Sequence, residues 1–248
     1  MRSLLSAATR AHRKALLDLR YGSGPLATLD VFPAEGPDAP MHVFLHGGYW
    51  RVGEKEKQAI LAEPLVQAGF PVVMLGTDLC PAVSLDTIVE QVMRGIVWTA
   101  KNAKRVGGDG RRIYLYGHSA GAHLAAMGLA EDWTKHGLPA DLICGSTMVS
   151  GIYDVEPVLH ISVNDLIKLT PDRVNALSPQ FHLPRKPVPV RSRSKRDDSR
   201  LSGLRRSPPS PSRPQPRPKL KSQSYQRRLA TMYSPPSTPV PPKSWMPI

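Results

Sequence analysis

Short apolar runs alternate with stretches of helical periodicity through the first three quarters of the chain. Four runs predict buried strands, at residues 41–45, 70–75, 113–116 and 142–149. Between them, residues 55–68 and 84–106 repeat apolar side chains at helical spacing, and Ser84 fits the N-cap of the second helix. Apolar strands separated by helices predict an α/β fold, with a mostly parallel sheet covered by helices on both faces.

The N-terminal 20 residues carry their leucines and alanines near a spacing of 3.6, which predicts a surface helix. Basic residues and serines without an acid before Asp18 also fit a transit peptide, which is the less favoured interpretation. No apolar run reaches the ~18 residues of a membrane span, so we expect no membrane partner. Two cysteines, Cys80 and Cys144, are too few for a disulfide framework or a thiolate metal site. They predict free thiols in a reducing compartment, and hence a cytoplasmic protein.

Charge and proline divide the chain near residue 185. Residues 185–248 contain 16 Lys+Arg and two acids, Asp197 and Asp198, whereas residues 1–184 contain 17 basic and 18 acidic residues. The last quarter also holds 14 of the 26 prolines. Such a segment buries too little apolar surface to offset its ordering entropy, so we predict a disordered tail. The chain thus divides into an N-terminal helix (1–20), an α/β domain (21–184) and a basic tail (185–248).

The segment Gly117-His118-Ser119-Ala120-Gly121 follows one predicted strand and precedes an apolar helical stretch. This is the G-x-S-x-G pattern, which places a serine nucleophile on a tight strand-to-helix turn. Gly117 and Gly121 avoid clashes in that turn, and the helix N-terminus favours negative charge developing near Ser119. The N–H of Ala120 is one donor of an oxyanion hole in this arrangement. The alternative is an ordinary serine in a glycine-rich turn.

A second motif, His46-Gly47-Gly48-Tyr49-Trp50, follows the first of the four predicted strands. Gly47 and Gly48 let the backbone approach a substrate and aim N–H groups at the oxyanion. His46 is predicted to brace the loop rather than to act as a base. Tyr49 and Trp50 fit either an aromatic substrate pocket or packing beneath the loop.

Four ordered segments carry a resemblance to a known family. They are H-G-G-Y-W (46–50), D-L-C-P (78–81), G-H-S-A-G-A-H-L (117–124) and S-G-I-Y-D (150–154). Over residues 20–184 they resemble the arylformamidase (kynurenine formamidase) branch of the α/β-hydrolase esterases, and also the hormone-sensitive-lipase-like group. The resemblance implies that Ser119 is the nucleophile and that Gly47, Gly48 and Ala120 form the oxyanion hole. It also implies hydrolysis of N-formylkynurenine or related aryl amides and esters, without a metal or organic cofactor.

The sequence departs from this family in its last quarter. In this fold the triad acid and then the histidine follow the serine, beyond the next two strands. No histidine follows His182, and the only acids after Asp172 are Asp197 and Asp198. We therefore expect a C-terminally truncated hydrolase domain of about six strands that lacks the triad acid and base and has impaired activity.

Other side chains are weak substitutes for the missing pair. The side chain of His118 is predicted to point away across the turn, and His123 to pack within the following helix. Asp154 fits a loop-structuring residue better than a triad acid.

Two origins of the basic tail stay open. A frameshift that replaced the end of a hydrolase gene is favoured, because out-of-frame reading of a GC-rich gene yields Arg, Ser and Pro. The alternative is a genuine appendage that binds nucleic acid or acidic partners. No Arg-Gly or Gly-aromatic pattern supports nucleic-acid binding. The second class of function is a non-catalytic binding protein that uses a hydrolase pocket as a receptor and the tail as an electrostatic anchor.

Overall fold

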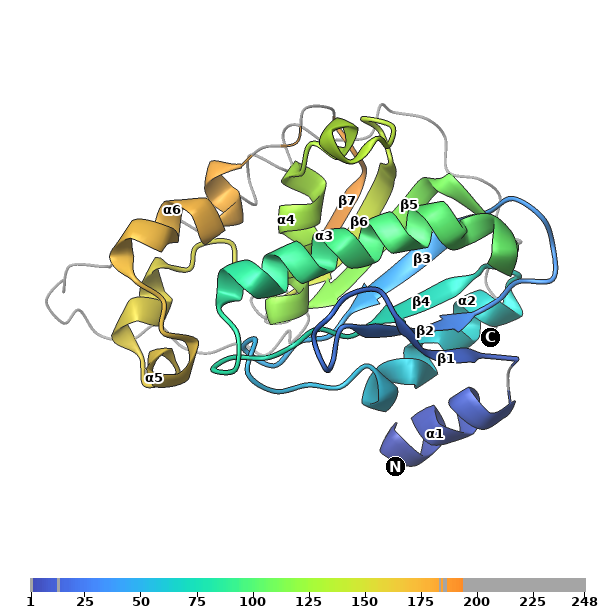
Figure 1. Cartoon of the computed structure of the whole chain (residues 1–248), viewed down its shortest axis with the longest axis horizontal. Coiled ribbons are helices and arrows are strands. Elements are labelled where there is room, and N and C mark those ends of the chain that lie inside the picture. The colour runs from blue at the N-terminus through green and yellow to red at the C-terminus, as the bar shows by residue number, and fades with distance from the viewer. Residues whose placement is uncertain (1, 13, 183, 185–186, 194–248) are drawn as a thin grey trace, which may run out of the picture.

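A seven-stranded sheet forms the centre of the molecule (Figure 1). The structure is a computed structural model that describes residues 2–12, 14–182, 184 and 187–193. The strands are β1 (Leu16–Arg20), β2 (Thr28–Phe32), β3 (Ala39–Leu45), β4 (Val72–Leu75), β5 (Gly108–His118), β6 (Ile143–Val149) and β7 (Val190–Arg193). They lie in the order β1-β2-β4-β3-β5-β6-β7. Neighbours from β4 to β7 are parallel, whereas β2 is antiparallel to both β1 and β4.

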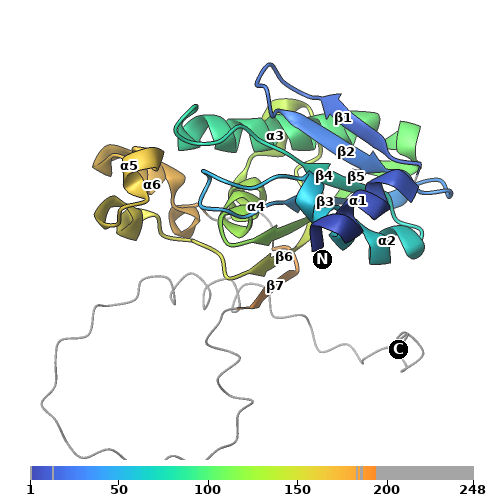
Figure 2. The same cartoon turned by 90° about the horizontal axis from the view of Figure 1, so that it is seen from below.

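Helices lie on both faces of this sheet (Figure 2). The helices are α1 (Arg2–His12), α2 (Glu63–Gln67), α3 (Leu85–Asn102), α4 (Ala120–Ala130), α5 (Asn164–Ile167) and α6 (Val174–Leu177). The 3-10 helices are η1 (Glu56–Ala62), η2 (Ala103–Val106), η3 (Trp133–His136), η4 (Glu156–His160), η5 (Pro171–Arg173) and η6 (Pro179–Phe181). None of the helices in the described residues is long and apolar enough to cross a membrane.

Alternate side chains along the strands enter two separate apolar cores. On β4, Val73 and Leu75 belong to the larger core, which includes the inner faces of α3 and α4. Val72 and Met74 point the other way and pack with Phe32 and η1. Because both faces are buried, the central strands are apolar without alternation. The predicted α/β class, with a mostly parallel sheet covered on both sides, is confirmed.

The long predicted helix is found as α3, which continues into η2. Ser84 is its N-cap, since its hydroxyl accepts a hydrogen bond of 3.2 Å from the N–H of Thr87. The helix predicted at 55–68 is instead split into η1 and α2. Pro64 lies at the start of α2 and lacks the N–H that would continue the helical ladder.

The N-terminal prediction is wrong beyond His12. Residues 16–20 form β1, which pairs with β2 through Leu19 with Leu29 and Arg20 with Thr28. Pairing with a strand further along the chain therefore overrides the local helical spacing. The apolar pattern does not predict β2, because Asp30 interrupts its apolar run.

The predicted boundary at residue 185 is too early. Residues 190–193 form β7 and pair in parallel with β6, from Ser146 with Val190 to Val149 with Arg193. A strand needs backbone partners rather than apolar side chains, so a basic sequence can still extend the sheet. The prediction of disorder for residues 185, 186 and 194–248 lies outside the described residues.

Candidate active site

The two glycine motifs meet where β3 and β5 end. Leu45 pairs with Gly117 in the parallel register of these strands, so the segments that follow them start at the same level. A Cβ added to Gly47 would lie 2.6 Å from the carbonyl oxygen of His118. The structure therefore places the 46–50 loop directly against the serine turn.

Ser119 has an unusual backbone conformation, with φ 55° and ψ −117°. Few residues other than glycine adopt a positive φ, and holding one there costs on the order of 1–3 kcal/mol. The surrounding backbone fixes it. The N–H of Ser119 donates to the carbonyl of Val149 at 2.8 Å, and its carbonyl accepts from the N–H groups of Ala122 and His123. The side chain is half-buried at the start of α4, as a nucleophile presented on a tight turn requires.

The glycines on either side of the serine are sterically required. A Cβ added to Gly117 would lie 2.5 Å from the backbone nitrogen of Ala122. A Cβ on Gly121 would lie 2.7 Å from the carbonyl oxygen of His46 and closer still to that of Leu45. Gly121 thus lets the first turn of α4 pack directly on the backbone that leads into the 46–50 loop.

Backbone N–H groups are available around the serine. Ala120 is the first residue of α4, and the first N–H groups of a helix have no partner within it. Within the described residues, neither Ala120 nor Gly48 donates a backbone hydrogen bond. Gly48 instead uses its carbonyl, which accepts from Arg51 and Val52 and shapes the loop as a turn. This arrangement can stabilise negative charge on a bound acyl group.

His123 joins the loop to the far side of the site. The indole N–H of Trp50 donates to its Nδ1 at 3.1 Å, so Nε2 carries the proton and donates to the carbonyl of Leu177 at 2.8 Å. Burial lowers the pKa of His123 to about 4. His123 is therefore a neutral packing residue, and Trp50, which is 2% exposed, packs beneath the loop.

His46 and Tyr49 differ in their exposure to solvent. His46 is buried, with Nδ1 3.1 Å from the carbonyl oxygen of Gly47, and burial lowers its pKa. Tyr49 has φ 50°, is 42% exposed and contacts the edge of Trp50. Tyr49 is thus the member of the aromatic pair that a ligand can reach.

No histidine in the described part of the chain hydrogen-bonds to Ser119. His118 is exposed on the turn, and His182 bonds backbone carbonyls of the 175–176 segment. Asp154 accepts a 3.0 Å bond from the N–H of Glu156, which orders its own loop.

Asp78 and the two cysteines lie outside both glycine motifs. Asp78, from the D-L-C-P segment, accepts 2.8 Å bonds from the N–H of Leu26 and the side chain of Gln91. Cys80 and Cys144 are both free thiols. Among the described residues, no three His, Cys, Asp or Glu side chains form a group that could hold a metal ion.

A sequence model of the BD-FAE family matches residues 29–165, more than half of the chain and both glycine motifs. The chain belongs to the BD-FAE family. With the relatives and solved structures below, this match confirms its α/β-hydrolase fold and its resemblance to the arylformamidases, and its lineage is one of hydrolases.

Several relatives of this BD-FAE chain are enzymes. The kynurenine formamidase of Danio rerio is 39% identical over 176 residues, which cover 70% of this chain and 58% of that protein. The kynurenine formamidase of Drosophila melanogaster is 30% identical over 168 residues, which cover 66% of this chain and 55% of that protein. The isoprenylcysteine alpha-carbonyl methylesterase of Arabidopsis thaliana is 36% identical over 117 residues, which cover 46% of this chain and 27% of that protein. The chain therefore spans less than two thirds of the length of these relatives.

Solved structures place the BD-FAE chain in the same fold. A candidate thioesterase from Silicibacter sp. TM1040 is 31% identical with a TM-score of 0.69, over 78% of this chain and 72% of that one. Esterase B from Lactobacillus rhamnosis, at 17% identity and a TM-score of 0.61, covers 77% of this chain and 71% of that one. The second similarity extends to the fold alone.

Proposed function

We propose that this chain is a serine hydrolase of small carboxylic esters or aryl amides, with an N-formylkynurenine-like substrate. One observation carries the proposal: Ser119 is held at positive φ on a turn that packs against the glycine loop of residues 46–50. Strain at a half-buried serine, beside backbone N–H groups that donate no backbone hydrogen bond within the described residues, suits a nucleophile better than a structural turn. The kynurenine formamidases among the relatives support the substrate class.

In the proposed reaction the Oγ of Ser119 attacks the acyl carbon, and a base takes the hydroxyl proton. The N–H groups of Ala120, Gly47 and Gly48 hold the negative oxygen of the tetrahedral intermediate. The bond to the amine or alcohol breaks, and the leaving group takes the proton. Water then cleaves the acyl-serine ester, which releases the acid and restores Ser119.

Labelling with a fluorophosphonate tests the nucleophile. We expect covalent labelling at Ser119, identified by peptide mass spectrometry, at a rate well below that of a relative with an intact triad, and none in Ser119→Ala. Ser150→Ala is the matched control, because Ser150 also follows a strand with a positive φ of 51° but lies outside the turn. Labelling at another residue, or none in the unchanged chain, contradicts the proposal.

The second part of the proposal concerns rate. Both ring nitrogens of His123 are hydrogen-bonded to other groups, and no histidine follows His182 in this sequence. An enzyme without its base keeps the contribution of the oxyanion hole and substrate binding, roughly 10³–10⁴ above water and several powers of ten below an intact triad. Turnover of an aryl formamide that matches an intact relative, and that Ser119→Ala abolishes, would show that a base operates in this chain.

The absence of a histidine bonded to Ser119 in the described residues favours a second candidate, a non-catalytic binding protein that uses the hydrolase pocket as a receptor. Calorimetric titration with an aryl amide distinguishes the two. A binding protein gives saturable heat without fluorophosphonate labelling, whereas the proposed hydrolase gives both.

A further inference from the structure

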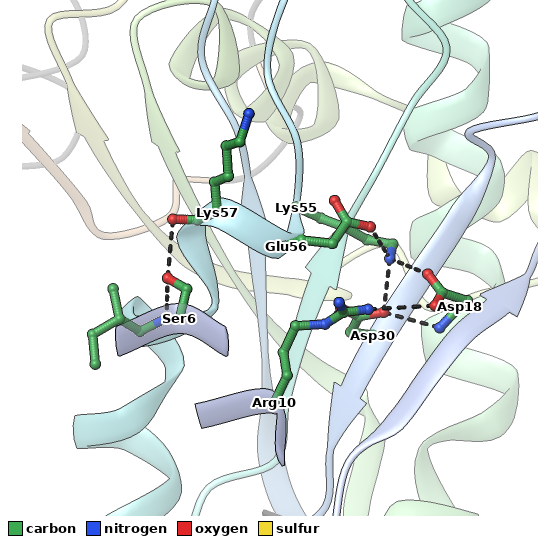
Figure 3. A network of polar contacts seen from close by, with 8 residues as sticks. Ser6, Arg10, Asp18, Asp30, Lys55, Glu56 and Lys57 are labelled. Atoms are coloured by element: carbon green, nitrogen blue, oxygen red, sulfur yellow. Dashed lines mark hydrogen bonds and ion pairs between the residues drawn. The ribbon is translucent and has the colours of Figure 1, made fainter. Parts of the chain in front are cut away.

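A cluster of charged side chains lies where the chain enters η1 (Figure 3). The cluster consists of Arg10, Asp18, Asp30, Lys55 and Glu56, and we call it the Lys55 cluster. Its two central side chains are buried, with Lys55 at 3% and Asp30 at 0% exposure. Buried charges are costly and persist only where they are paired and hydrogen-bonded, so the pairing fixes the positions of these side chains.

Lys55 uses all three of its donors. Its Nζ lies 2.5 Å from Asp18, 2.8 Å from Asp30 and 2.6 Å from Glu56. Burial opposes the charge, but the hydrogen bonds to these carboxylates raise the pKa of Lys55 above its usual value. In turn, the hydrogen bond from Lys55 lowers the pKa of Asp18. The ammonium thus joins the segment before η1 to both β1 and β2.

Arg10 extends the same contacts to α1. Its Nε donates to the second oxygen of Asp30 at 2.9 Å, and its Nη2 lies 3.3 Å from Asp18. The N–H of Asp18 also donates to Asp30 at 2.9 Å. The N-terminal helix and the segment before η1 therefore bind the same two carboxylates, Asp18 of β1 and Asp30 of β2.

The opposite end of this segment contacts the 46–50 loop, whose N–H groups are the proposed oxyanion donors and which we call the oxyanion loop. Gly53 has φ 125°, and a Cβ there would lie 2.5 Å from the carbonyl oxygen of Gly47 and closer still to the ring Nδ1 of His46. A cavity of about 40 Å³, large enough for one water, lies between His46, Gly53 and Lys55. Only Glu54 separates Gly53 from Lys55. If Lys55 moves, Gly53 is expected to move with it and to shift the carbonyl group of Gly47 that it packs against.

We propose that Lys55 is a positioning residue for the oxyanion loop, anchored by carboxylates from two strands so that Gly53 holds the Gly47 backbone toward Ser119. The inference rests on the proposed function only in assigning a catalytic use to that loop. Without Lys55, Asp30 would remain buried with Arg10 as its one cation among the described residues. The segment would then move toward solvent to hydrate the carboxylate.

The test compares Lys55→Met with Lys57→Met, a matched control two residues away. Lys57 is 59% exposed and pairs with Glu54 at 2.6 Å, so its replacement leaves the cluster intact. Hydrogen exchange followed by mass spectrometry reports on residues 46–53, and fluorophosphonate labelling reports on Ser119. We expect at least tenfold faster exchange in that segment for Lys55→Met only. Labelling should slow by about tenfold to a hundredfold, as small misplacements of reacting groups do.

Two further variants keep the result decisive. Asp30→Asn/Lys55→Met removes the uncompensated carboxylate but still lacks the ion pairs that anchor residue 55 to β1 and β2, so exchange at 46–53 should rise in it as well. Its data replace those of Lys55→Met if the single variant fails to fold. Lys55→Arg preserves the ion pairs and should recover most of the protection. Unchanged exchange at 46–53, or exchange that rises equally in β3 and β5, overturns the positioning role. If the unchanged chain does not label at all, the proposed function fails, and the exchange comparison alone decides the inference.

Discussion

At the scale of single residues, the strain at Ser119 has a measurable consequence. Glycine tolerates φ 55° without the steric cost that any larger residue meets. We expect Ser119→Gly to have a free energy of unfolding about 1 kcal/mol higher than that of Ser119→Ala, because both lack the hydroxyl and only alanine keeps the strain. Urea denaturation of the two variants measures the difference. Equal stability would mean that the turn relaxes when the serine is removed.

Gly121 provides a second test at this scale. In Gly121→Ala the new methyl group would overlap the carbonyl oxygens of Leu45 and His46. Overpacking of this kind destabilises by about 1–3 kcal/mol, and backbone atoms cannot move aside as side chains do. Gly36→Ala is the control, because nothing lies within 4 Å of its added Cβ. We expect a lower midpoint of urea denaturation for Gly121→Ala alone, and equal midpoints would contradict the close packing of α4 on β3.

At the scale of elements, His123 links α4, the 46–50 loop and α6. Its pKa of about 4 lies below the usual value of 6.5, so between those values the unfolded chain binds a proton that the folded chain does not. The stability from keeping His123 neutral is therefore full above pH 6.5 and is lost as the pH falls toward 4. From the size of the shift the loss is about 3 kcal/mol.

Thermal melts from pH 7 to pH 4 check this expectation. The fall in stability should be shallower in His123→Asn than in the unchanged chain. His160→Gln is the control, because the side chain of His160 is exposed. An identical pH profile for all three proteins would show that His123 is not buried in the neutral form.

Among the strands and turns of the fold, only some can be predicted from the sequence. β3, β5 and the serine turn can be predicted from local patterns. The apolar run predicts the strand, and the glycines that follow it predict the tight turn where the strand ends. β1 could not be found in this way, since Leu16–Arg20 becomes a strand only through pairing with β2. The Lys55 cluster cannot be predicted from local patterns either, because it joins side chains that are far apart in the chain. Its one visible signal is Asp30, a charge within an apolar run.

At the scale of the whole molecule, β1 is the first strand in the sheet order and carries exposed leucines. Leu16 and Leu17 are 44% and 39% exposed, and Leu4 of α1 is 76% exposed. An edge strand with apolar side chains promotes strand pairing between molecules. We expect Leu17→Lys to slow aggregation on heating severalfold, measured by light scattering.

Leu166→Lys is the matched control for this prediction. Leu166 is also 39% exposed but lies on α5, away from a strand edge. If both substitutions slow aggregation equally, general surface charge rather than the edge of β1 is responsible.

The contact of Gly121 with the carbonyls of Leu45 and His46 has a consequence for protein engineering. The pentapeptide at 117–121 owes its shape to a neighbouring strand as well as to its own residues. A graft of that pentapeptide into another scaffold would lose the strain on the serine unless β3 and its glycines were transplanted with it. The smallest segment that can be transferred with the serine turn intact is thus the pair of adjacent strands β3 and β5 with the loops that follow them.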